Sequence, residues 1–210
     1  MKRALITMSA SVALCVAGAA SEQVLLIRGA RVHTASAAGT LQNTDVLVRS
    51  GRIAAVGSAL AAPAGVPVVE ARGRALTPGM FGGLTKIGLE EVGLEPSTVD
   101  AELELPAPAW THHWRPEFDV TRAFNPRSIV LAVARIEGVT WAMLAPTAEH
   151  SLIAGQGAAV ALDGRFDAVL GGRSLFVNWG SAALNASGGS RAAQFMLFDQ
   201  AIREVRDPAA

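Results

Sequence analysis

The chain changes character at Pro78-Gly79, and this change limits the folds open to it more than any other feature. Before it, short apolar runs alternate with turn residues, a pattern that predicts short strands joined by tight turns. Residues 45–49 and 52–56 flank Ser50-Gly51, a two-residue hairpin turn in which glycine adopts a positive φ. We also expect a strand at residues 24–27 and a strand pair at residues 66–71 and 74–77, bent at Gly73.

After Pro78-Gly79 the periodicity becomes that of helices and buried strands. Apolar residues recur at helical spacing over residues 129–136, with Asn125 as the expected cap, Pro126 in the first turn and Gly138 at the end. The continuous apolar run at 139–145 predicts a strand buried on both faces. We then expect a hairpin at residues 158–162 and 166–170, a separate strand at 174–178, and a last helix over 191–206. The expected inward face of that helix is Ala192, Phe195, Met196, Ile202 and Val205.

These patterns predict an α/β protein in which a small N-terminal β-sandwich portion, residues 21–77, precedes a parallel β/α region, residues 78–210. A closed (β/α)8 barrel needs roughly 200 residues or more, so the second region is expected to hold only the first β/α units of an incomplete barrel. Such a piece exposes sheet edges, and we expect it to self-associate through them.

The first 20 residues have the organisation of a cleavable signal peptide. Lys2 and Arg3 precede an uncharged apolar stretch, and small residues follow at positions 17–20, where we expect cleavage. A membrane anchor is the alternative, but a spanning helix needs roughly 20 apolar residues and this stretch is shorter. We therefore expect an exported protein, periplasmic or secreted, with no membrane association after cleavage.

Composition excludes several other classes of function. Cys15 is the only cysteine and leaves with the signal, so no disulfide or thiol chemistry is expected. Loss of Lys2 and Arg3 leaves 16 basic residues against 18 acidic ones. This balance argues against nucleic acid and anionic membrane surfaces as partners and leaves a small-molecule substrate or ligand.

The residues around the change of character resemble a known family. GRALTPGMFGGLTKIGLEEV, residues 73–92, resembles the junction between β-sandwich and barrel in the amidohydrolase superfamily, especially its exported imidazolonepropionase-like members. The preceding segments LLIRGARVHT, DVLVRSGRIAAVG and VVEARGRALTPG resemble that family's N-terminal strands in order and spacing. Later segments, FNPRSIVLAVARIEGVTWAMLAPTAEHSLIAGQGAAVALDG and GGSRAAQF, resemble the same subgroup.

The resemblance implies hydrolysis of C–N bonds other than peptide bonds by a metal-activated water, with zinc or another divalent metal as the family's cofactor. In that family a His-x-His pair follows the Pro-Gly of the first barrel strand. Here Leu84 and Lys86 occupy the two histidine positions, and the later ligands would fall beyond residue 210. We therefore predict no metal ligand, no catalytic residue and no cofactor for this chain alone.

Several other residues are candidates for a site near the end of the first barrel strand. Lys86 offers a point charge for an anionic ligand; Glu90, Glu91 and Glu95 follow the strand, although glutamates there are usually solvated. His150 follows the apolar run at 139–145, near where barrel site loops begin. His112 and His113, between Trp110 and Trp114, are interpreted as a packed surface loop, Gly188-Gly189-Ser190 as a turn and helix cap, and Gly155-Gln156-Gly157 as a turn.

Three functions remain open from the sequence. The first is an exported amidohydrolase-like protein that is a fragment of a longer enzyme. The second is a catalytically inactive binding or scaffold protein that keeps the fold without its metal. The third is a non-functional truncated product.

Overall fold

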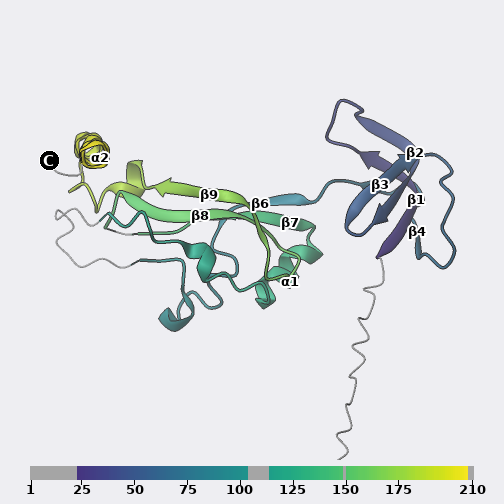
Figure 1. Cartoon of the computed structure of the whole chain (residues 1–210), viewed down its shortest axis with the longest axis horizontal. Coiled ribbons are helices and arrows are strands. Elements are labelled where there is room, and N and C mark those ends of the chain that lie inside the picture. The colour runs from purple at the N-terminus through teal and green to yellow at the C-terminus, as the bar shows by residue number, and fades with distance from the viewer. Residues whose placement is uncertain (1–22, 104–113, 149, 208–210) are drawn as a thin grey trace, which may run out of the picture. The chain divides into compact units, whose positions relative to one another are not determined.

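The computed structural model describes residues 23–103, 114–148 and 150–207, and it divides into two compact units at Pro78 and Gly79 (Figure 1). The expected signal peptide, Cys15, Trp110, His112 and His113 lie outside these ranges. The protein is mixed α/β, with far more strand than helix. Within these ranges no helix is long and apolar enough to span a membrane.

The first unit is one five-stranded sheet. Its strands are β1 (Val24–His33), β2 (Thr40–Arg49), β3 (Arg52–Gly57), β4 (Val68–Glu70) and β5 (Ala75–Leu76). The order is β3-β2-β1-β4, and β5 also pairs with β1. The predicted hairpin is confirmed: β2 and β3 pair antiparallel around Ser50 and Gly51, whose φ angles are +47° and +73°. Positive φ at both positions matches the twist of the strands they join.

The predicted pairing of residues 66–71 with 74–77 is wrong. Both segments instead run parallel to β1, β4 beside Leu26–Arg28 and β5 beside Arg31 and Val32. Ala71 N donates to Arg28 O (2.8 Å) and Gly73 N to Gly29 O (2.7 Å), so the turn is pinned to β1. A sandwich also needs a second layer, whereas residues 23–78 form a single sheet.

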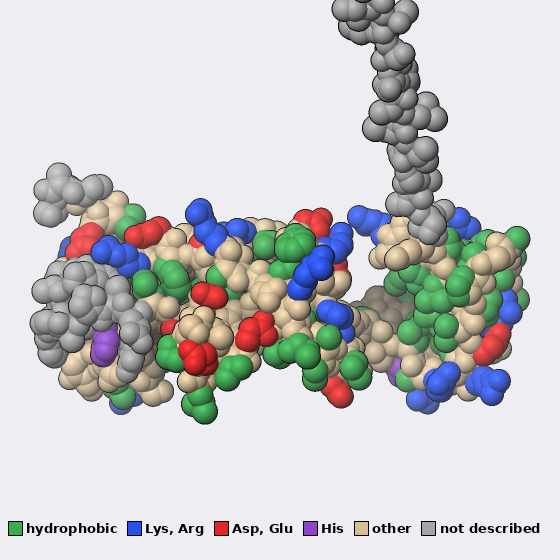
Figure 2. All heavy atoms as spheres, turned by 90° about the horizontal axis from the view of Figure 1, so that it is seen from below, with side chains coloured by type: hydrophobic (Ala, Val, Ile, Leu, Met, Phe, Trp, Pro, Cys, Tyr) green, Lys and Arg blue, Asp and Glu red, His purple; other side chains and the backbone are tan. Residues whose placement is uncertain are grey.

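One part of this sheet's surface is apolar and open. A cavity of about 260 Å³ is lined mainly by aliphatic side chains, among them Ile27, Val46, Ile53 and Val56. Ile53 and Val56 are exposed, and Figure 2 shows hydrophobic side chains gathered on this unit. The buried cluster beneath is small: Ala30, Val32, Val46 and Ala71. A unit of this size buries little core by itself.

The second unit is built on a four-stranded sheet in the order β6-β7-β8-β9. Its strands are β6 (Met80–Thr85), β7 (Val139–Leu144), β8 (Ile153–Ala161) and β9 (Val169–Val177). The pair β6–β7 is parallel, and β8 and β9 follow antiparallel. Between β6 and β7 come the short helices η1 (Pro96–Thr98) and η2 (Val120–Arg122) and the helix α1 (Ile129–Ile136); η3 (Gly180–Ala183) and α2 (Arg191–Arg206) follow β9.

Helix α1 has the predicted bounds but a different cap. Ser128 precedes it and accepts a hydrogen bond from Val130 N (3.3 Å), whereas Asn125 accepts from Arg127 N (3.0 Å) and closes the turn before the helix. The inner face of α1 buries Leu131 completely. The core around it joins β7, β8 and the connecting loops through Leu89, Val120, Leu144, Val160 and Leu162.

Three strand predictions need correction. In β7 only Ala142 and Leu144 are buried, while Thr140 and Trp141 are exposed, so the strand is not buried on both faces as expected. Gly155-Gln156-Gly157 is not a turn but part of β8, where a Cβ on Gly157 would collide with the carbonyl oxygen of Leu144. Residues 174–177 belong to β9 rather than to a separate strand, so the β8–β9 hairpin is longer than expected.

Helix α2 also has the predicted bounds, but the expected inward face is wrong. Phe195, Met196 and Val205 are exposed, and the buried residue is Gln194. Gln194 accepts from Gly180 N (3.0 Å) and donates to Gly180 O (2.9 Å), so an amide side chain holds the helix to η3. Trp179 adds edge-on contacts to Phe195 and Phe198, with centroids 4.9 and 5.9 Å away.

Candidate functional site

The candidate site lies where the parallel strands β6 and β7 end. Ala145 N donates to Thr85 O (3.1 Å), which continues the pairing of the two strands to their carboxyl ends. Lys86 follows Thr85 directly, and Ile87 N donates to the Thr85 hydroxyl (3.1 Å) to turn the chain. In barrels and open parallel sheets, this end of the strands is where reactive side chains gather.

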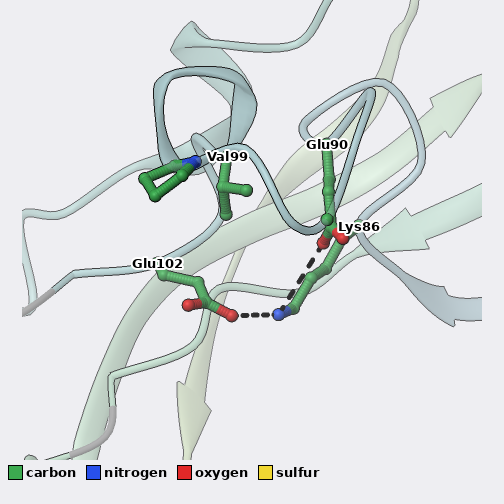
Figure 3. A pocket seen from close by; sticks show the side chains of 6 residues that line it. Lys86, Glu90, Val99 and Glu102 are labelled. Atoms are coloured by element: carbon green, nitrogen blue, oxygen red, sulfur yellow. Dashed lines mark hydrogen bonds and ion pairs between the residues drawn. The ribbon is translucent and has the colours of Figure 1, made fainter.

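The ammonium of Lys86 lies between two carboxylates (Figure 3). It donates a hydrogen bond to Glu102 Oε1, and Glu90 Oε2 lies 4.0 Å from the same nitrogen. Figure 3 shows both acidic side chains turned toward the lysine from separate loops. The cluster therefore holds one positive and two negative charges.

Backbone bonds position both acids. Thr147 N donates to Ala101 O (2.8 Å) and Leu103 N to Thr147 O (2.9 Å), so Glu102 lies on a short parallel bridge to the segment after β7. Glu90 is held by a tight turn, in which Leu89 N donates to Lys86 O (2.8 Å). The loop that carries Glu102 is thus an extension of the sheet beyond β7.

Two cavities are lined in part by this cluster. One, of about 450 Å³, is lined by Lys86, Glu90, Gly93, Pro96, Val99 and Glu102. The other, of about 360 Å³, is lined by Thr85, Lys86, Ile87, Glu90, Glu91 and Val130. The side chains of Lys86, Glu90 and Glu102 are 35%, 30% and 44% exposed, so all three meet solvent. The interpretation of Lys86 as a free charge for an anion does not hold here, because carboxylates already neutralise it.

Glu91 and Glu95 have structural partners. Glu91 accepts hydrogen bonds from Asn125 Nδ2 (3.1 Å) and Ser128 Oγ (2.9 Å), which fixes the start of α1. Glu95 accepts from Ser97 N (3.4 Å) and Ser97 Oγ (2.7 Å), which caps η1. The cap predicted at Ser190 is confirmed, since its hydroxyl accepts from Ala193 N (3.4 Å).

His150 lies apart from the cluster. It is half-buried in the turn between β7 and β8, three residues after Thr147, and is not among the described residues that line either cavity. The histidines at 112 and 113 fall outside the described ranges, so the described part of the second unit brings no imidazole to Lys86.

The residues at the end of β6 do not fit a divalent metal. Leu84 is 69% exposed and has no ligand atom, and the Lys86 ammonium has no lone pair to offer a metal. Within residues 23–103, 114–148 and 150–207, no three His, Cys, Asp or Glu side chains are grouped so that they could hold a metal ion.

Glu102 is the site residue that the sequence did not reveal. It lies in the alternating stretch Ala101-Glu-Leu-Glu-Leu105, which hints at a strand. Its partnership with Lys86 depends on the bridge to Thr147, a contact between segments 45 residues apart that periodicity does not report.

No protein-family profile matches the chain. Over 71 residues, about a third of its length, it is 44% identical to a dihydroorotase of Geobacter sulfurreducens and 41% identical to one of Citrifermentans bemidjiense. The match covers 16% of each of those enzymes. Among solved structures, an amidohydrolase from Thermotoga maritima superposes with a TM-score of 0.70 at 23% identity, over 87% of this chain and 48% of that one. The chain thus spans about half of that structure's length and shares its fold.

Proposed function

We propose, from the confirmed resemblance to the amidohydrolase superfamily, that this chain is an exported amidohydrolase-like protein, periplasmic or secreted. The family to which it is similar hydrolyses C–N bonds other than peptide bonds. A hydrolase-type small-molecule site is therefore the function that the fold supports best. The whole enzyme's activity belongs to this proposal, because the chain covers only part of its relatives.

We further propose that the second unit is the opening part of a (β/α)8 barrel. In support, α1 lies between β6 and β7 in the chain and packs against β7, as in a strand–helix–strand unit with parallel strands. The outer face of α1 carries exposed Ile129, Val133 and Ile136, an apolar stripe of the kind that a neighbouring helix covers in a complete barrel.

The observation that carries the chemical part of the proposal is the ion pair of Lys86 with Glu102. A metal, when bound in this family, supplies an activated water. Here a protein ammonium stands at the end of β6, with two carboxylates as its counter-charges. We propose that this chain alone is catalytically inactive and binds no catalytic metal. Lys86, Glu90 and Glu102 instead line a small-molecule cavity.

Metal content and turnover test this proposal together. The exported protein is dialysed against a chelator, equilibrated with zinc, and analysed for bound metal and for hydrolysis of cyclic amides and acyl-dipeptides. We expect far less than one zinc per chain and no turnover above the uncatalysed rate. A zinc content near one per chain, together with turnover lost in His150→Ala, contradicts the proposal and points to a relocated site.

The double variant Leu84→His/Lys86→His is the matched control. It places two imidazoles, which can ligate a metal, at the two His-x-His positions. Zinc retention should rise in this variant relative to the parent. Equal retention in the two proteins would show that the missing imidazoles at these two positions are not what excludes the metal.

Export has its own test. From the small-residue cluster at positions 17–20 we propose a mature N-terminus at Ala20 or Ser21. N-terminal sequencing of protein recovered outside the cytoplasm should read one of these two starts. Recovery of chains that begin at Met1 in the membrane fraction would refute the proposed cleavage.

A further inference from the structure

The cavity of about 450 Å³ beside Lys86 is built within one stretch of the chain. The residues that line it all lie in the range 86–102, which follows β6. Backbone contacts hold this stretch in shape, since Glu90 forms an antiparallel bridge with Val99. Next to that bridge, Asp100 N donates to Leu89 O (2.7 Å). The volume is that of a small-molecule site, about 300–1,000 Å³, and the wall uses no edge strand.

The cavity wall carries a surplus negative charge. Its charged residues are Lys86, Glu90 and Glu102, and the other lining residues are uncharged. The Lys86 ammonium donates its hydrogen bond to Glu102, so Glu102 is the acid that it neutralises. Glu90 Oε2 lies 4.0 Å from the same nitrogen, which is beyond hydrogen-bond distance. The surplus charge is therefore on Glu90.

The Glu90 carboxylate has capacity to bind a further group. A carboxylate has about four acceptor positions, two on each oxygen. Among the described residues, the only charged group near this one is the Lys86 ammonium, and none of them donates a hydrogen bond to it. The side chain is half-buried and lines the cavity. A ligand in the cavity can therefore donate hydrogen bonds to Glu90.

Gly93 leaves the space that this carboxylate occupies. A Cβ at Gly93 would collide with Glu90 Oε1. Gly93 is not among the glycines with positive φ, so its backbone conformation does not require glycine. The absence of a side chain there instead allows the carboxylate to lie in the cavity wall.

We propose that this cavity binds a small organic cation, a primary ammonium group on a short aliphatic chain. The inference rests on the proposed small-molecule site and names the class of its ligand. The ammonium group donates charge-assisted hydrogen bonds to Glu90 and neutralises the surplus charge. The aliphatic chain contacts Pro96 and Val99, and the described lining residues include no aromatic ring that would favour a flat ligand. Figure 3 shows the three charged groups drawn together and the Val99 side chain apart from them.

A cation fits this cavity better than an anion or a neutral ligand does. An anion would be repelled by the surplus negative charge, because the Lys86 ammonium is already bonded to Glu102. A neutral ligand would displace water from the Glu90 carboxylate without supplying a counter-charge, which costs free energy. An ammonium group replaces that water and supplies the charge.

Three probes of similar shape and different charge test the ligand class. Pentylammonium, pentanol and pentanoate are each titrated into the purified protein while the amide signals of residues 86–102 are followed by NMR. We expect saturable shifts with pentylammonium that weaken at high salt, because the attraction is electrostatic. Pentanol should bind at least about tenfold more weakly, and pentanoate should not bind.

The same titrations separate this inference from the proposed function. Binding of pentanol or pentanoate as tightly as pentylammonium would overturn the cation class and leave the small-molecule cavity standing. Absence of shifts with all three probes would overturn the cavity as well.

Variants of the charged residues test the placement of the ligand. Lys86→Met removes the cation that competes for the carboxylates, so pentylammonium should bind about tenfold more tightly. Glu90→Gln removes the surplus charge and should weaken binding about tenfold or more. Gly93→Ala keeps every charge but displaces the Glu90 carboxylate, and it should also weaken binding.

Glu117→Gln is the matched control, because it removes the same charge from an exposed ion pair with Arg115 that does not line the cavity. It should leave pentylammonium binding unchanged. Circular dichroism of each variant shows whether it is folded. Weaker binding in a folded Lys86→Met variant, or undiminished binding in a folded Glu90→Gln variant, would overturn the proposal.

Discussion

Lys86 Nζ and Glu102 Oε1 form an ion pair between the end of β6 and a loop that bridges to Thr147. The pair adds a side-chain contact between two segments that the bridge to Thr147 already brings together, and Glu90 Oε2 lies 4.0 Å from the same nitrogen. Because the ammonium has two acidic neighbours, removing one acid leaves it with a counter-charge. The cluster can therefore lose Glu102 without leaving an unpaired charge.

Glu102→Gln should consequently cost little stability. All three side chains meet solvent, and exposed ion pairs contribute about 0–1 kcal/mol, less at high salt. We expect the unfolding free energy, measured by urea denaturation, to fall by less than about 1 kcal/mol. Glu117→Gln, which removes the partner of Arg115 at 4.0 Å, is the control on another exposed pair. A fall in unfolding free energy much larger than the control's would mean that Glu102 stabilises its loop through contacts other than the ion pair.

Glu91 should matter more, although it lines one of the same cavities. It accepts hydrogen bonds from Asn125 and Ser128, and Ser128 is the buried N-cap of α1. Glu91→Ala leaves both donors without this acceptor, so we expect a loss of about 1–2 kcal/mol in unfolding free energy. Glu137→Ala, an exposed position at the other end of α1, should change it by less than about 0.5 kcal/mol. Equal losses in the two variants would show that the hydrogen bonds of Glu91 to Asn125 and Ser128 do not stabilise the start of α1.

Asp119 predicts an acid dependence of stability. Burial opposes ionisation of this carboxyl, but hydrogen bonds from Thr121 and Arg173 outweigh it and lower its pKa below 3.8. A carboxyl whose folded pKa is depressed stabilises the fold fully above its unfolded pKa and loses that contribution as pH falls through the folded value. The parent should therefore exceed Asp119→Asn in unfolding free energy near neutral pH, and the gap should close below pH 3.8.

Urea denaturation at a series of pH values measures this gap. Asp167→Asn is the control, since its exposed carboxyl lies 3.7 Å from Arg165 in a solvated pair. It should change the unfolding free energy by less than about 0.5 kcal/mol near neutral pH. A gap between the parent and the Asp119→Asn variant that stays constant from neutral pH to well below 3.8 would show that the Asp119 charge does not support the β8–β9 hairpin.

Local signals predicted the local elements of this fold well. The Ser50-Gly51 hairpin and the two α-helices were predicted from turn residues and hydrophobic periodicity. Both signals depend on residues that are close together in the sequence. Pairings between distant segments were not predicted. The segments that form β4 and β5 read as a hairpin, because their neighbour in space, β1, is more than 30 residues away in the chain.

In the candidate site, too, the residues near β6 in the sequence were predicted, and the one held by a distant contact was not. Lys86 and Glu90 were identified because they follow β6 directly, whereas Glu102 needed the bridge to Thr147. The inner face of α2 was misassigned for a related reason. Hydrophobic periodicity selects the face that would bury most apolar surface. In the described chain Gln194 instead bonds Gly180 of η3, and two phenylalanines contact Trp179. Trp114 also donates its indole N–H to Glu204 of the helix.

Gln194 therefore yields the sharpest stability prediction. Its side chain is 1% exposed; it accepts from Gly180 N (3.0 Å) and donates to Gly180 O (2.9 Å) and Ser187 Oγ (3.3 Å). Gln194→Ala removes these three hydrogen bonds and opens a cavity, so we expect a loss of about 2–4 kcal/mol in urea denaturation. Gln194→Glu should lose nearly as much at neutral pH, because a carboxylate cannot donate to Gly180 O. Asp199→Ala, at an exposed position on the same helix, should cost less than about 0.5 kcal/mol. Similar losses at positions 194 and 199 would show that α2 is not anchored through Gly180.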